Sequence, residues 1–182
     1  VMRRFVCVVL CCIGLMSQAN AQDNTLEESL QSMRIPVTQQ RLPAPNFTLS
    51  KLAGQTLQLS DYRGIVVLLH FWARFCTPCL KDMPALEALW QDHREQGFVV
   101  LAVAADRGSV DPIRRFVEAG AYSFPILLDP EGTVRHQYEV RALPTTYLIG
   151  RDGRFIGREL GAREWNSTQG RLLVQGLLQQ IK

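Results

Sequence analysis

Around residue 75 the spacing of apolar residues changes from the pattern of a buried strand to that of a helix. Residues 65–72 (IVVLLHFW) are β-rich and apolar on both faces, which is typical of a central strand covered from both sides. From Cys79 to about Arg94, apolar residues such as Met83 and Leu86 recur at three- and four-residue spacing on one face. This stretch therefore predicts a buried strand that leads into an amphipathic helix.

The rest of the chain continues an alternation of strands and helices. The expected elements, in chain order, are a hairpin at 47–59, a strand at 98–104, a helix at 111–120, a strand at 124–128, a hairpin at 145–156 and a helix at 172–181. Asp111 is the expected N-cap of its helix, and Asp152-Gly153 is a hairpin turn dipeptide. The order predicts an α/β fold with one mixed central sheet and helices on both faces.

The first residues have the pattern of a secretory signal peptide. Arg3 and Arg4 precede an almost unbroken apolar run at 5–16, and residues 19–21 match an A-x-A cleavage site. The run is shorter than the roughly 20 residues of a membrane-spanning helix, and an uncleaved anchor is the alternative. We expect a signal peptide at 1–21, an N-terminal extension at 22–41 that is a polar helix or loose arm, and one domain at 42–182.

Export would leave only Cys76 and Cys79 of the five cysteines in the mature protein. One close pair is not a disulfide scaffold, and its loop is too short to restrict the unfolded chain much. Redox or metal chemistry therefore explains the pair better than stapling does. Without the signal the net charge falls from +3 to +1 and the basic residues are scattered, which predicts no nucleic-acid partner.

The segment Cys76-Thr77-Pro78-Cys79 lies where the predicted strand meets the predicted helix. Free N–H groups at a helix start favour a thiolate on Cys76, and the thiolate is the nucleophilic form. Cys79, one turn further on, can close a small disulfide and is expected to be the more buried, resolving thiol. Pro78 stiffens the turn. The spacing thus suits dithiol–disulfide exchange.

A metal site is the competing interpretation of the cysteine pair. Structural zinc needs four ligands, but there is no second cysteine pair, and His70, His93 and His136 are scattered. Two thiolates and a histidine suit copper, so a copper carrier or thiol chaperone stays open as an alternative. We favour redox chemistry with no bound metal and no cofactor other than a redox-active disulfide.

Two segments resemble those of a known family. Residues 71–84 (FWARFCTPCLKDMP) are similar to the active-site segment of thioredoxin-fold proteins, and most of all to the TlpA/ResA-like branch, which is related to AhpC/TSA domains. Residues 140–149 (VRALPTTYLI) resemble the cis-proline segment of that family. The resemblance covers about residues 42–181 and implies a thioredoxin-like fold with thiol–disulfide oxidoreductase activity.

The resemblance also implies roles for individual residues. Pro144 is expected to be cis and to lie beside Cys76, which would expose the backbone of Leu143 to an incoming extended chain. Asp82 stands where the branch usually has Glu, and a carboxylate there could move the proton of Cys79. The alternative for Asp82 is an exposed helix acid that the helix dipole favours.

The sequence departs from the family pattern at several positions. Phe75 replaces a tryptophan, and His70 stands where thioredoxin has a buried acid; we interpret His70 as a core residue rather than a catalyst. A peroxiredoxin-like peroxidase, the other open alternative, would need threonine where Ala73 stands. The candidate substrate-binding residues are Leu143, Trp72, Phe75, Thr77 and Pro78, of which Trp72 and Phe75 are expected mainly to pack around the site.

The residues predict thiol–disulfide exchange at Cys76 and Cys79, and the resemblance implies that this exchange reduces disulfides in periplasmic proteins. The resemblance implies disulfide-bearing or thiol protein substrates, with cytochrome c maturation as one setting, and a membrane thiol-electron transporter as the reductant. The protein is expected to be a monomer.

Overall fold

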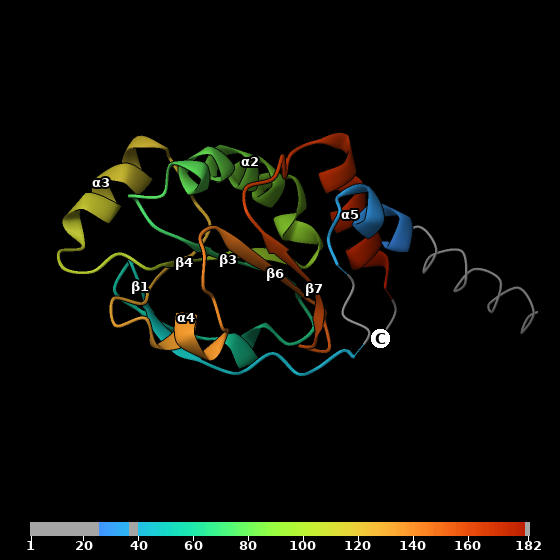
Figure 1. The fold of residues 1–182 in the computed structure, drawn as a ribbon, viewed down its shortest axis with the longest axis horizontal. Helices are drawn as coiled ribbons and strands as arrows, with labels where there is room; N and C mark the ends of the chain where they lie inside the picture. Colours follow the sequence, from blue (N-terminus) through green and yellow to red (C-terminus); the bar gives the residue numbers. More distant parts are fainter. Residues whose placement is uncertain (1–25, 37–39, 181–182) are drawn as a thin grey trace, which may run out of the picture.

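The computed structural model describes residues 26–36 and 40–180, so the predicted signal peptide lies outside the described residues (Figure 1). The centre of the structure is one seven-stranded mixed sheet with the strand order β2-β1-β5-β4-β3-β6-β7. The strands are β1 (Thr48–Lys51), β2 (Thr56–Gln58), β3 (Val66–Trp72), β4 (Phe98–Ala104), β5 (Ile126–Leu128), β6 (Thr145–Ile149) and β7 (Phe155–Leu160).

The pairing of the strands confirms the predicted mixed sheet. Strands β3, β4 and β5 are parallel neighbours, whereas β6 joins β3 and β7 in antiparallel fashion. Every residue of β3 and β4 is buried, in agreement with their unbroken apolar runs. Strand β3 lies between β4 and β6 in the interior of the sheet. The residues that follow its carboxyl end therefore start between two neighbouring strands and not beside an outer strand.

Helices cover both faces of the sheet, as predicted, but unequally (Figure 1). The helices are α2 (Thr77–His93), α3 (Asp111–Ala119), α4 (Thr133–Gln137) and α5 (Thr168–Gln179), with short 3-10 helices at Leu59–Tyr62 and Arg94–Gln96. Side chains of α2, α3 and α5 share one apolar cluster with one sheet face. The other face packs on the short α4 and on the chain before and after β1 and β2.

Three helices differ from the sequence-based expectation, two in where they begin and one in its presence. Asp111 is the first residue of α3 and Val110 is its N-cap. The five-residue α4 was not expected, because it is too short to display a helical period. Helix α5 begins at Thr168, four residues early, because Ser167 caps it by accepting the Gly170 N–H at 3.2 Å.

The part of the N-terminal extension that the structure describes is packed rather than loose. Residues 26–32 are helical, and Leu26, Leu30 and Met33 are buried in the cluster beneath α5. Their four- and three-residue spacing forms a narrow apolar face. A Cβ added at Gly157 would lie 2.7 Å from Cγ2 of Ile35, so this segment approaches β7 as closely as only glycine allows.

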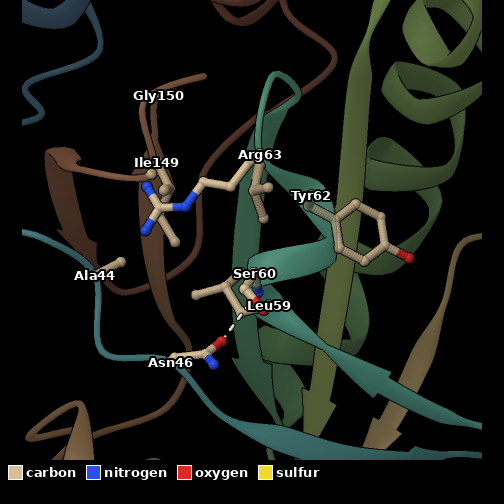
Figure 2. Close-up of a pocket in the computed structure, with 10 residues that line it drawn as sticks. Ala44, Asn46, Leu59, Ser60, Tyr62, Arg63, Ile149 and Gly150 are labelled. Atoms are coloured by element: carbon tan, nitrogen blue, oxygen red, sulfur yellow. Dashed lines mark hydrogen bonds between the residues drawn. The ribbon is translucent and has the colours of Figure 1, made fainter.

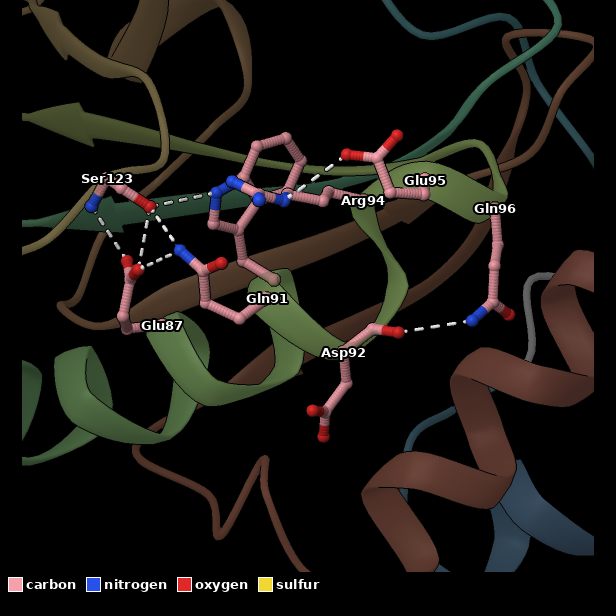
Figure 3. A network of polar contacts seen from close by, with 8 residues as sticks. Glu87, Gln91, Asp92, Arg94, Glu95, Gln96 and Ser123 are labelled. Carbon is pink, nitrogen blue, oxygen red and sulfur yellow. Dashed lines mark hydrogen bonds and ion pairs between the residues drawn. The ribbon is translucent and has the colours of Figure 1, made fainter.

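A polar network fixes the middle of α2 to the loop before β5 (Figure 3). The Glu87 carboxylate accepts the Ser123 N–H at 2.8 Å and the Ser123 hydroxyl at 2.7 Å. Gln91 and Trp90 also donate to the Ser123 hydroxyl, at 2.6 and 3.2 Å. These contacts hold the helix, and hence its N-terminal end, in place over the sheet.

Candidate active site

Cys76 and Cys79 are joined by a disulfide at the start of α2. Cys76 is the N-cap, and its Sγ accepts the N–H of Cys79 at 3.3 Å. Cys76 is 9% exposed and Cys79 is fully buried, so Cys79 is the more buried of the two residues, as predicted. In the reduced protein this N–H and the helix dipole would stabilise a thiolate on Cys76.

The residues around the pair divide into exposed and buried groups. Thr77 and Pro78 are exposed between the cysteines. Phe75 is 74% exposed, so it does not pack around the site as expected but projects from it. Trp72 is fully buried, with its ring 5.4 Å from that of Phe116. Trp72 therefore supports the site from below, and only the other three present surface to a partner.

Asp106 holds the segment that connects β3 to the cysteines. Its carboxylate accepts the backbone N–H of Arg74 at 3.0 and 3.2 Å, and the Arg74 Nε lies 3.5 Å from Asp106 Oδ1. The Asp106 residue is 9% exposed, so these bonds are partly shielded from water. The bend before Cys76 is therefore fixed from the end of β4.

The Leu143–Pro144 peptide bond is cis, as the resemblance implied. The Pro144 carbonyl accepts the N–H of Gly161 at 2.9 Å, which ties this loop to the end of β7. Leu143 is half-buried, and neither its N–H nor its carbonyl has a hydrogen-bond partner among residues 26–36 and 40–180. Its backbone is therefore available for pairing with another extended chain.

Asp82 lies on the buried side of α2, the helix that begins at the cysteine pair, so it is not an exposed helix acid. The residue is 2% exposed, and its Oδ1 accepts the backbone N–H of Arg163 at 3.2 Å. Burial raises the pKa of Asp82 from 3.8 to about 6, although the Arg163 N–H, the nearby Trp165 indole and the Arg163 charge act against the rise. Neither Asp82 Oδ2 nor Trp165 Nε1 has a hydrogen-bond partner within the described chain.

An ion pair between a buried carboxylate and a partly exposed guanidinium lies next to Asp82. Glu159, on β7, is 3% exposed and pairs with the guanidinium of Arg163. Burial raises the pKa of Glu159, and the Arg163 charge opposes that rise. One residue, Arg163, thus contacts Asp82 through its backbone and Glu159 through its side chain.

His70 lies within the sheet and is uncharged. It is fully buried, and burial lowers its pKa to about 3. Its Nδ1 lies 2.9 Å from the Thr146 hydroxyl, while its Nε2 has no partner among the described residues. The strand registers pair His70 with Thr146 and Thr146 with Glu159, so these three form one polar row across β3, β6 and β7.

Other parts of the described chain offer no comparable chemistry. Among residues 26–36 and 40–180 there is no group of three or more His, Cys, Asp or Glu side chains that could hold a metal ion. A pocket where β3 begins is lined by groups such as Asn46, Ser60, Tyr62 and Arg63 (Figure 2). The cysteines follow the opposite end of β3, so this pocket is separate from them.

The sequence did not reveal the supporting role of Asp106, Glu159, Arg163 or Trp165. Asp106 follows a predicted strand at the sheet edge that holds the cysteines, and this position is a usable signal. The other three belong to a strand end and a loop whose approach to Asp82 depends on tertiary packing, and no motif marks them.

Comparison with known proteins agrees with this site. A sequence model of the AhpC/TSA family matches residues 41–156. The thiol-disulfide oxidoreductase ResA of Bacillus thuringiensis subsp. konkukian is 36% identical over 113 residues, which cover 62% of this chain and 65% of the relative. The ResA of Bacillus anthracis is 33% identical over 129 residues, which cover 71% of this chain and 74% of the relative.

A solved structure extends the comparison to the fold. The crystal structure of a Chlorobium tepidum protein assigned as a thiol:disulfide interchange protein DsbE is 30% identical, with a TM-score of 0.68, over 75% of this chain and 96% of that one. No helix within residues 26–36 and 40–180 has the length and apolarity needed to cross a membrane. The chain therefore belongs to the AhpC/TSA-related, TlpA/ResA-like family of thioredoxin-fold thiol–disulfide oxidoreductases.

Proposed function

We propose that this protein is an exported thiol–disulfide oxidoreductase that reduces disulfides of periplasmic proteins. The observation that carries the proposal is the position of the cysteine pair at the start of α2, where Cys76 is 9% exposed and Cys79 is fully buried. The exposed Phe75, Thr77 and Pro78 and the unpaired backbone of Leu143 are the proposed surface for an extended substrate segment.

The proposed reaction has two exchange steps. The Cys76 thiolate attacks a substrate disulfide, so that a Cys76–substrate bond forms, the substrate S–S bond breaks, and one substrate thiolate leaves and takes a proton. Cys79 then loses its proton and attacks Cys76 Sγ, which forms the Cys76–Cys79 disulfide and releases the second substrate thiolate. Two electrons pass from the protein to the substrate, and the protein ends oxidised.

Asp82 is the proposed acceptor of the Cys79 proton. Its raised pKa of about 6 makes it a stronger base than an ordinary aspartate while leaving it mostly ionised at neutral pH. Among the described residues no partner lies at hydrogen-bond distance and angle from Oδ2, and the group is 2% exposed, with the Trp165 indole nearby to stabilise the carboxylate. Return of the oxidised protein to the dithiol needs an external dithiol reductant, for which we propose a membrane thiol-electron transporter.

The setting of this reaction is also proposed rather than observed. Residues 1–21 would direct export, residues 22–41 would form the extension, and residues 42–182 would be the thioredoxin-like domain, acting as a monomer. Disulfides between the haem-binding cysteines of cytochrome c are one substrate class for such a reductant. A peroxidase is less favoured because Ala73 stands where that chemistry needs threonine.

Trapping of substrates tests the proposal. Cys79→Ala expressed in cells should accumulate mixed disulfides on Cys76, because the resolving attack is lost. Cys76→Ser/Cys79→Ala is the matched control and should accumulate none. If the Cys79→Ala protein carries no more disulfide-linked partners than the control, and the wild-type protein fails to reduce insulin disulfides, the function is refuted.

A further inference from the structure

The end of β7 and its connection to α5 contact two parts of the site, the cis-proline loop and Asp82. Gly161 donates to the carbonyl of Pro144 at 2.9 Å, and the N–H of Arg163 donates to Asp82 Oδ1 at 3.2 Å. Glu159 stands in register with Thr146, whose hydroxyl contacts His70. The segment from Glu159 to Trp165 is therefore a support for the acid and for the cis-proline loop together.

Arg163 hydrogen-bonds to Asp82 through its backbone N–H and not through its guanidinium, although the guanidinium charge still lowers the pKa of Asp82. Its guanidinium pairs with Glu159, on β7, instead. Asp82 Oδ2 has no hydrogen-bond partner among the described residues. Arg163, whose backbone N–H bonds Oδ1, has a long charged side chain, but that side chain does not bond Oδ2. A direct carboxylate–guanidinium pair would satisfy that oxygen, but the guanidinium pairs with Glu159 and the Trp165 indole lies near the Asp82 carboxyl instead.

The other charged groups near Asp82 do not account for this arrangement. Lys81, on the same helix, and Glu164, on the loop, line a groove beside Asp82 together with Arg163, but both side chains are exposed and screened by water. His70, from the sheet below, is uncharged because burial lowers its pKa to about 3. Glu159 is the buried anion that competes for the guanidinium.

We propose that the Glu159–Arg163 ion pair is a positioning device that holds the guanidinium away from Asp82, so that the carboxyl stays anchored by one backbone N–H yet free to accept and release a proton. Both residues act through Asp82 and neither touches the reacting sulfurs in this scheme. The inference rests on the proposed role of Asp82 as the proton acceptor of Cys79, and it adds what keeps that group able to titrate.

The proposal predicts shifts of opposite sign for the two partners. Glu159→Gln frees the guanidinium to approach Asp82 Oδ2, which should lower the pKa of Asp82 by about one pH unit. Arg163→Met removes the positive charge, which should raise the pKa of Asp82 by about as much. Loss of either charge shifts this pKa in these directions by its Coulomb effect alone, so the positioning role is identified by size. Glu159→Gln should lower the pKa of Asp82 more in the protein that has Arg163 than in the Arg163→Met background.

The test is the titration of the Asp82 carboxyl carbon, followed by 13C NMR in the oxidised full-length protein. The double variant Glu159→Gln/Arg163→Met leaves no unpaired buried charge. Compared with Arg163→Met, it gives the fall caused by loss of the Glu159 charge alone; if Arg163→Met fails to fold, the pKa of Asp82 in the double variant should still lie above that in Glu159→Gln by at least about one pH unit. Arg171→Met is the matched control, because it breaks an exposed arginine–carboxylate pair with Asp92 (3.1 Å) and should leave the Asp82 titration unchanged.

The outcomes separate this inference from the proposed function. Opposite shifts in Glu159→Gln and Arg163→Met, with a larger fall on Glu159→Gln when Arg163 is present than when it is replaced by Met, support the positioning role, and equal falls overturn it. Shifts of the same sign, or no shift beyond that of Arg171→Met, overturn it. If the carboxyl shifts are opposite but the pH profile of disulfide reduction does not follow them, the positioning role stands and the use of Asp82 as a base is refuted.

Discussion

Asp82→Asn should stabilise the oxidised protein at alkaline pH, although the residue lies in the site. The native pKa of Asp82 is about 6 against 3.8 for an ordinary aspartate, so the folded protein binds the proton more tightly than the unfolded chain. A folded state that holds more protons loses stability as pH rises through this interval. At about 1.4 kcal/mol per pH unit, the ionised carboxyl destabilises the fold by roughly 3 kcal/mol above pH 6.

The asparagine variant removes this dependence with little change of shape. Its amide oxygen can still accept the Arg163 N–H that Oδ1 accepts at 3.2 Å. The free energy of unfolding of the variant, relative to wild type, should therefore rise by about 2–3 kcal/mol between roughly pH 4 and pH 8. Other titrating groups, Glu159 among them, are common to both proteins and cancel in the difference.

Urea denaturation of the oxidised proteins at several pH values measures this difference. The same variant should lose rate in disulfide reduction, because the proton of Cys79 has lost its acceptor. If the free energies of unfolding of the two proteins change in parallel between these pH values, then burial does not disfavour the ionised form of Asp82 in the folded protein. The reasoning from its burial to its chemistry would then fail as well.

Two further changes test the supports of the site. Leu30→Ala should lower the free energy of unfolding by about 2–5 kcal/mol, because Leu30 is 1% exposed in the core. Leu172→Ala, at a 51% exposed position, is the control and should change it little. Equal losses of the two variants in urea denaturation would contradict the packing of the N-terminal segment. Asp106→Ala should speed hydrogen exchange of the Arg74 N–H, because this N–H loses both carboxylate contacts at 3.0 and 3.2 Å. If NMR shows that its protection from exchange is unchanged, Asp106 does not hold the segment before Cys76.

The sheet and the cysteine pair were predictable because their signals are local. The apolar run that predicted a central strand from residue 65 corresponds to β3 (Val66–Trp72), and the run at 98–104 coincides with β4. The position of the cysteines follows from the change of period at the end of β3. The cis bond before Pro144 is different, since only the resemblance implied it and no spacing in the sequence does.

The packed N-terminal segment was missed although a local signal existed. Leu26, Leu30 and Met33 are separated by four and three residues, which is a helical period. Their polar neighbours made the segment look solvated, because a narrow apolar face gives little average hydrophobicity. Its partner surface, which includes Gly157 and Gly176, lies more than a hundred residues away in the sequence.

The surroundings of Asp82 could not be predicted because they are set by contacts across the fold. The sequence places an acid three residues after Cys79 and leaves open whether it is exposed or catalytic. Burial decides between the two, and burial depends on the loop from 161 to 167, which has no motif of its own. The pKa of Asp82 thus depends on the assembled fold. Helix α2 supplies the carboxyl group, but Arg163 and the buried Glu159 determine which charges lie near it.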